Sequence, residues 1–125
     1  MNAILIPVSI GELFDKYSIL QIKSEKIIDN NKLILINQEL NYLKNIINNL
    51  NIDLKMIPII KEINEKLWII EDQIREKEMK QEFDNEFILL ARLVYKTNDK
   101  RSQIKNEINI LFNSNIIDIK SYSNY

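Results

Sequence analysis

The segment 67–78 carries the residues of this chain that are most suited to chemistry, and it holds the only tryptophan, Trp68. Glu71, Arg75 and Glu78 stand at i, i+4 and i+7, so on a helix they share one narrow face. That face lies beside the apolar stripe rather than opposite it, with Trp68 on its other flank. Charges between two apolar surfaces predict a ligand site or a buried ion network. The alternative is a surface Glu–Arg pair worth roughly 0.3–0.5 kcal/mol.

A second candidate is Arg92, the only charge in the apolar run 87–95. A guanidinium can hold a carboxylate or phosphate through two parallel hydrogen bonds. Arg92 therefore predicts an anion clamp. The alternative is a structural ion pair with Glu12, Glu71 or Asp72 that holds the helices in register.

Downstream, Asn98 and Asp99 precede Arg101 and Lys105, which are one helical turn apart. If a helix starts here, its free amides and the two cations could hold a phosphate or carboxylate. The alternative is an N-cap followed by a solvated face.

Several classes of active site are excluded because the chain contains neither cysteine nor histidine. Zinc–thiolate sites, Ser–His–Asp triads and imidazole acid–base catalysis all require one of these residues. We therefore predict no cofactor. The alternative is Mg²⁺ held by oxygen ligands, for which the candidate residues are Glu12, Asp15, Glu71, Asp72 and Glu78.

Length and composition set further bounds. A chain of 125 residues with a net charge of −1 fits one domain and has no basic surface for nucleic acid. Its apolar runs are too short to span a bilayer, and its first residues do not resemble a signal peptide. We therefore expect neither nucleic-acid nor membrane partners. The absence of cysteine fits a reducing compartment, so we expect a cytoplasmic protein.

Apolar periodicity predicts an all-α fold, a single compact bundle of about five helices. The expected helices span residues 10–28, 31–51, 58–81, 85–96 and 99–112, with caps at Ser9 and Asp84. Residues 3–8 and 116–119 read as extended, and could pair as a short β-ribbon. The helix at 85–96 is apolar on nearly every side, so we expect it to be the most buried. Strong apolar seams on the second and third helices leave room for a homodimer interface.

Several separated segments together resemble one known family. They are Pro7–Leu13 with Asp15-Lys16, Leu67-Trp68 with Ile70–Asp72 and Arg75, Phe87 with Leu90–Arg92 and Val94-Tyr95, Asn98-Asp99 with Arg101, Ile104-Lys105 and Ile108-Asn109, and Lys120–Tyr122. In this combination the chain resembles a family of small, mostly bacterial domains of unknown function. The resemblance implies one domain with polar residues spread over the first, third, fourth and fifth helices. It implies no activity.

These observations favour a binding or assembly module whose mixed acid–base centre faces an anionic small molecule or a partner protein. The candidate ligand-binding residues are Glu12, Lys16, Trp68, Glu71, Asp72, Arg75, Arg92, Asn98, Arg101 and Lys105. In this hypothesis Arg92, Arg101 and Lys105 contact the anion. The alternatives are a Mg²⁺-dependent nucleotide or sugar-nucleotide hydrolase, a metal-free helical mutase, and a structural component of a viral or envelope assembly. Whether the polar centre is a pocket or a clasp depends on whether every acid meets a base.

Overall fold

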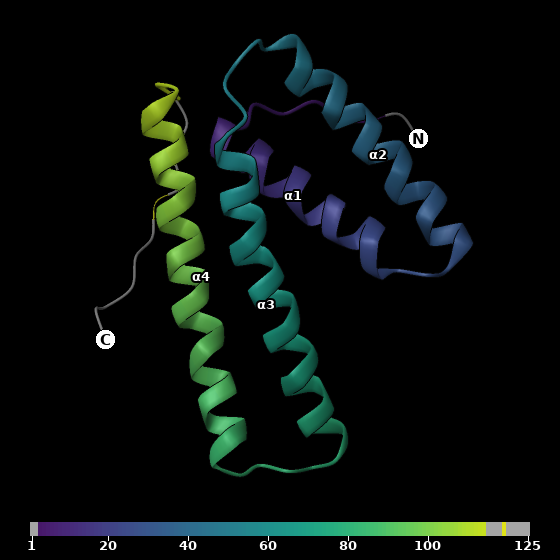
Figure 1. Cartoon of the computed structure of the whole chain (residues 1–125), viewed down its shortest axis with the longest axis vertical. Helices are drawn as coiled ribbons and strands as arrows, with labels where there is room; N and C mark the ends of the chain where they lie inside the picture. Colours follow the sequence, from purple (N-terminus) through teal and green to yellow (C-terminus); the bar gives the residue numbers. More distant parts are fainter. Residues whose placement is uncertain (1–2, 115–118, 120–125) are drawn as a thin grey trace.

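The computed structural model describes residues 3–114 and 119, and in this part of the chain it contains four α-helices and no strand. They are α1 (Ile10–Lys26), α2 (Asn30–Asn49), α3 (Met56–Met79) and α4 (Asn85–Leu111). The helices α3 and α4 form a long antiparallel hairpin, α1 crosses it, and α2 runs back along α1 (Figure 1). The all-α prediction is confirmed, whereas the number of helices was wrong.

Two of the helix starts agree with the sequence prediction. The Ser9 hydroxyl accepts a hydrogen bond from the Glu12 amide at 3.0 Å, which caps α1. The Asp84 carboxylate accepts one from the Phe87 amide at 3.0 Å, which caps α4. These local signals hold because each one satisfies an amide that the helix itself leaves unpaired.

The fourth and fifth predicted helices are one continuous helix, α4. The sequence Thr97-Asn98-Asp99 favours turns and caps, and for that reason it predicted a break. In the structure Thr97 is buried in the middle of α4, and α4 packs along α3. Tertiary packing therefore outweighs the weak helix propensity of these three residues.

The prediction that residues 85–96 are the most buried helix was also wrong. Leu90 is buried there, but Ile88, Leu89 and Leu93 are 53%, 56% and 44% exposed. The reason is visible in Figure 1, where the lower half of the α3–α4 hairpin extends beyond α1 and α2. The central helix is α1, which contacts each of the other three.

The core lies where α1, α2, α3 and the end of α4 meet. Phe14 of α1 is fully buried and packs edge-on against Phe112, with ring centroids 5.9 Å apart. Leu43 and Ile47 of α2 and Ile60 of α3 pack into the same cluster. The apolar seams proposed for a dimer interface are thus used, at these positions, within one chain.

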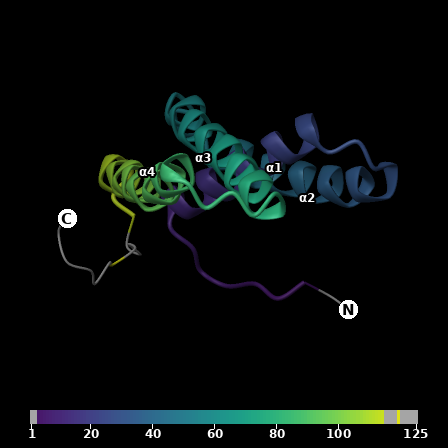
Figure 2. The ribbon, with the colours of Figure 1, turned by 90° about the horizontal axis from the view of Figure 1, so that it is seen from below.

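The segment 3–8 is extended and runs clear of the helices (Figure 2). We call residues 3–8 the arm. Its predicted ribbon partner, 116–119, lies outside the described residues except for Ile119, so the ribbon is not seen in the described part of the chain. None of the described helices is long and apolar enough to cross a membrane.

Candidate functional site

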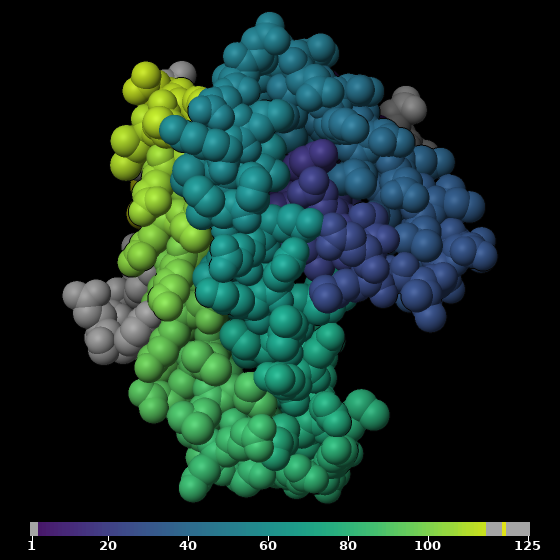
Figure 3. Space-filling model, in the orientation of Figure 1, coloured from purple at the N-terminus to yellow at the C-terminus, as the bar shows by residue number. Residues whose placement is uncertain are grey.

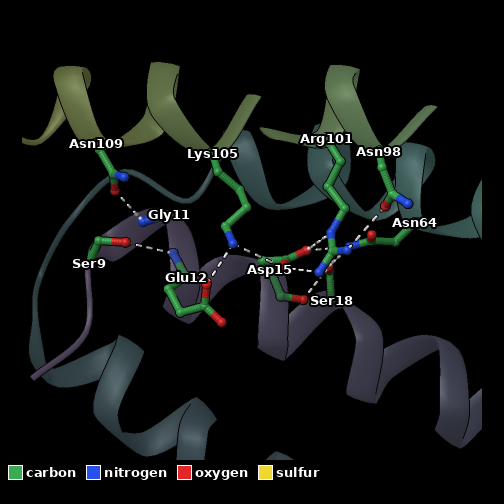
Figure 4. Close-up of polar contacts among 10 residues, drawn as sticks. All are labelled: Ser9, Gly11, Glu12, Asp15, Ser18, Asn64, Asn98, Arg101, Lys105 and Asn109. Carbon is green, nitrogen blue, oxygen red and sulfur yellow. Dashed lines mark hydrogen bonds and ion pairs between the residues drawn. The ribbon is translucent and has the colours of Figure 1, made fainter. Parts of the chain in front are cut away.

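The carboxylate of Asp15, on the second turn of α1, is the centre of a buried polar cluster (Figure 4). Asp15 is 1% exposed. The Nε of Arg101 donates to Oδ1 at 2.9 Å, and Nη2 of the same guanidinium donates to Oδ2. The Nδ2 of Asn64 also donates to Oδ1, at 2.8 Å. The carboxylate is therefore bound by two fixed donors from α3 and α4.

A second base extends the cluster. The Nζ of Lys105 lies 3.6 Å from Oδ2 of Asp15 and 2.6 Å from Oε2 of Glu12. Two acids thus face two bases. We call Glu12, Asp15, Asn64, Arg101 and Lys105 the clasp, and its net charge is zero.

The electrostatics of Asp15 follow from this geometry. Burial by itself raises the pKa of a carboxyl group, since it disfavours the charged form. Hydrogen bonds from Arg101 and Asn64, together with the charges of Arg101 and Lys105, outweigh burial and lower the pKa of Asp15 below its ordinary value. Asp15 is consequently ionised at neutral pH and is poorly placed to act as a general acid.

The clasp continues into a close contact between α1 and α4. The Gly11 amide donates to Oδ1 of Asn109 at 2.7 Å (Figure 4). A Cβ on Gly11 would lie 2.5 Å from the Lys105 carbonyl oxygen, closer than atoms can approach. The lone glycine of the chain therefore lets the two helix backbones touch, and Asn109, Lys105 and Arg101 meet α1 at one-turn intervals.

Beside the clasp, residues of α1, α3 and α4 line a small open recess of about 150 Å³. Its apolar lining consists of Ile19, Ile22, Leu67 and Trp68, and its polar lining consists of Asn64, Glu71, Asn98 and Arg101. A groove of about 290 Å³ adjoins it along α3, lined by Trp68, Glu71, Asp72 and Arg75. Figure 3 shows the concave outline where α1 and α2 diverge from the lower half of α3.

The structure brings together eight of the ten predicted ligand-binding residues. Trp68, Glu71, Asn98 and Arg101 line the recess, Asp72 and Arg75 line the groove, and Glu12 and Lys105 belong to the clasp. The other two lie elsewhere.

Lys16 points to α2, where its Nζ is 3.8 Å from Glu39. Arg92 is exposed on α4 and forms no ion pair with Glu12, Glu71 or Asp72 in the described structure, so the structural ion pair given as the alternative to an anion clamp is wrong.

The face that carries Glu71, Arg75 and Glu78 is not a buried network. Glu71 and Arg75 form an i,i+4 pair at 3.7 Å, with side chains that are 47% and 76% exposed. This is the surface pair that the sequence left open as the alternative. Glu78 is exposed.

The five acids considered for magnesium do not gather around a point. Among residues 3–114, no three acidic side chains are arranged to hold a metal ion. Asp15 is instead held by Arg101 and Lys105.

The sequence analysis did not identify three polar residues that lie in or beside the clasp. They are Ser18, Asn64 and Asn109. Asn64 joins the Asp15 carboxylate to the Ser18 hydroxyl, donating to both at 2.8 Å. One signal was available: a polar residue at 64 interrupts the apolar stripe formed by Ile60, Ile63 and Leu67. Asparagine is so frequent in this chain that its position carried little information.

Comparison with known proteins identifies one family that matches this chain. Residues 4–125 match the model of a family of unknown function, DUF6165. The chain belongs to this family. No curated protein and no solved structure matches it. The resemblance seen in the sequence is thereby confirmed, and the family description carries no activity.

Proposed function

We propose that this DUF6165 chain is an assembly module that pairs with a second copy through its arm. The observation behind the proposal is the exposure of three consecutive aliphatic residues, since Ile4, Leu5 and Ile6 are 75%, 82% and 71% exposed. Burial of such a side chain is worth roughly 1.5–3 kcal/mol. Contiguous exposed apolar surface on a small protein marks an interaction site.

Two features restrict the backbone conformations of the arm. Pro7 locks its own φ angle and restricts Ile6 to extended conformations. The next residue but one, Ser9, is buried and caps α1. The five steps between successive residues from Ile4 to Ser9 span about 17 Å in an extended chain, at roughly 3.3 Å per residue. The loss of conformational entropy when the arm crosses an interface is therefore reduced at Ile6 and Pro7.

The recess beside the clasp has the size and an apolar side to receive one aliphatic side chain of the arm. A cavity of about 150 Å³ admits a group the size of benzene, which is close to one isoleucine or leucine side chain. Ile19, Leu67 and Trp68 supply apolar walls. Residues 3–8 carry no charge, so insertion would bring no further ion into the recess, where Glu71 and Arg101 are paired with Arg75 and Asp15. In a two-fold pair each arm would enter the recess of the other copy, and the contact would form twice.

The ion pairs within the clasp make the alternative proposal, an anion site at Arg101 and Lys105, less favourable. Both cations already face acids at close range, and an incoming anion would have to displace Asp15 or Glu12. In this proposal the clasp holds α1 against α3 and α4, and so keeps the recess in shape.

Light scattering on size-exclusion fractions tests the pairing. We expect the mass to rise from 14.9 kDa towards twice that value as concentration increases, and Ile6→Asp to remain monomeric. Ile28→Asp is the matched control, because Ile28 is 91% exposed but lies outside the arm. Wild type that stays monomeric at high concentration, or an Ile6→Asp chain that still pairs, would refute the proposal.

The lone tryptophan gives a second readout in the same samples. Trp68 lines the recess, so its emission should shift to shorter wavelength as the pair forms, and Ile6→Asp should abolish the shift. Pairing without any change at Trp68 would place the arm somewhere other than the recess.

A further inference from the structure

The outer face of α4 carries three cations in a row, and they are separate from the clasp. Arg92, Lys96 and Lys100 stand at i, i+4 and i+8, so they follow one side of the helix at intervals of about 6 Å. Arg92 and Lys100 are exposed and Lys96 is half-buried. All three line one open hollow of about 660 Å³.

No acid within the described residues forms an ion pair with this row. Nine of the sixteen described basic side chains form ion pairs. Arg92, Lys96 and Lys100 are among the seven that form none in the described structure, and they are the three of these that stand in a row on one helix. Asp99 also lines the hollow but lies within ion-pair distance of neither Lys96 nor Lys100. Among the described residues, the lining therefore has a net charge of +2, from three cations and one carboxylate.

The row is electrostatically unfavourable as it stands. Like charges at i,i+4 destabilise a helix by roughly 0.2–0.5 kcal/mol per pair, and the row contains two such pairs. Their repulsion would be relieved by an anion lying along the helix. Arg92 supplies the planar fork that grips phosphate through two hydrogen bonds, and the two lysines supply mobile point charges.

The hollow is also of the size of a small-molecule site, since such sites typically measure about 300–1,000 Å³. Besides the cations, its described lining includes the polar side chain of Gln103. A net charge of +2 is matched by a ligand with at least two negative charges.

We propose that the Arg92–Lys96–Lys100 face of α4 binds a small molecule that carries two or more phosphate charges. This site is distinct from the arm and the recess, and it does not depend on whether the chain pairs with a second copy. It assigns Arg92 the anion-binding role that the sequence suggested, but with Lys96 and Lys100 as partners in place of Arg101 and Lys105.

Isothermal titration with inorganic pyrophosphate, tripolyphosphate and ADP, at low and at physiological salt, tests the site. We expect binding that weakens with salt, and at least a tenfold loss of affinity in the variant Arg92→Gln/Lys96→Gln/Lys100→Gln. The matched control is Lys26→Gln/Lys32→Gln/Lys44→Gln, which removes the same net charge from exposed lysines on α1 and α2. It should bind nearly as well as wild type.

The three probes separate the possible sources of the phosphate. Tighter binding of ADP than of pyrophosphate would indicate a nucleotide. Equal binding of the two would indicate recognition of the phosphates alone. Absence of binding by all three probes, or an equal loss in both triple variants, would overturn the proposal, because the attraction would then be absent or non-specific.

Discussion

Replacement of Asp15 by asparagine should destabilise the fold strongly, because it removes the one charge on which two cations converge. Arg101 and Lys105 side chains are 29% and 10% exposed, and both face the Asp15 carboxylate. Loss of one partner from a buried ion pair costs about 3–5 kcal/mol. Lys105 keeps Glu12 at 2.6 Å and Arg101 is partly hydrated, which places the expected loss near the lower end, about 3 kcal/mol.

Urea denaturation followed by far-ultraviolet circular dichroism measures this loss. With a urea slope of roughly 1–3 kcal/mol per molar, the midpoint should fall by about 1–3 M. Glu39→Gln is the control, because it also removes one negative charge, but from a 3.8 Å surface pair with Lys16. That control should change the free energy of unfolding by less than about 0.5 kcal/mol.

A double variant distinguishes the loss of an ion pair from a simple loss of packing. Asp15→Leu/Arg101→Leu should be more stable than Asp15→Leu alone, since the second change removes a partly buried cation that no longer faces the Asp15 carboxylate. An Asp15→Asn chain within about 1 kcal/mol of wild type would refute the reasoning. So would a double variant less stable than the single one.

Three further measurements test the Gly11 contact, the pKa of Asp15 and the ion pairs of Lys77. Gly11→Ala should lower the free energy of unfolding in urea by about 1–3 kcal/mol, because the added Cβ would lie 2.5 Å from the Lys105 carbonyl oxygen. Alanine by itself favours helices more than glycine does, so a stabilised variant would contradict the close approach of the two helices. Folding lowers the pKa of Asp15 below 3.8. The stabilisation that the ionised carboxylate provides is therefore present above pH 3.8 and is lost as the pH falls through the folded-state pKa, so the stabilities of wild type and Asp15→Asn should converge below pH 3.8 in an acid titration. A difference in stability that stays constant over this range would be inconsistent with the lowered pKa. Lys77 meets Glu82 and Asp84 of the α3–α4 turn and Glu86 of the first turn of α4, at 2.9–3.3 Å. Lys77→Met should therefore lower the melting temperature at low salt and less in 1 M NaCl; an equal loss at both salt concentrations would point to lost packing instead.

Much of the secondary structure could be predicted from the sequence because it is encoded locally. The caps at Ser9 and Asp84 and the apolar periodicity of α1, α2 and α3 depend on residues within one or two turns. The continuity of α4 could not be read in this way. Thr97 and its neighbours favour a turn locally, and only the packing of α4 along α3 decides the outcome.

The candidate site was predictable in part for the same reason. Trp68 and Arg101 stood out because tryptophan and arginine are scarce in this chain, and both line the recess. The pairing of Arg101 with Asp15 joins residues 86 positions apart, so no local pattern reveals it. For Arg92 the local sequence was misleading. The apolar residues around it suggested burial, whereas that part of α4 extends beyond α1.

The most direct test of the central claim, that two copies pair by inserting the arm into the recess, is a cross-link between two different chains. The protein has no cysteine, so Leu5→Cys and Ile19→Cys can each be made as the sole thiol in its chain. Mixed and oxidised under conditions that promote exchange, the two variants should give a disulfide-linked heterodimer that contains one of each, in preference to either homodimer. Failure to form this species, with Leu5→Cys linking only to itself, would contradict the account.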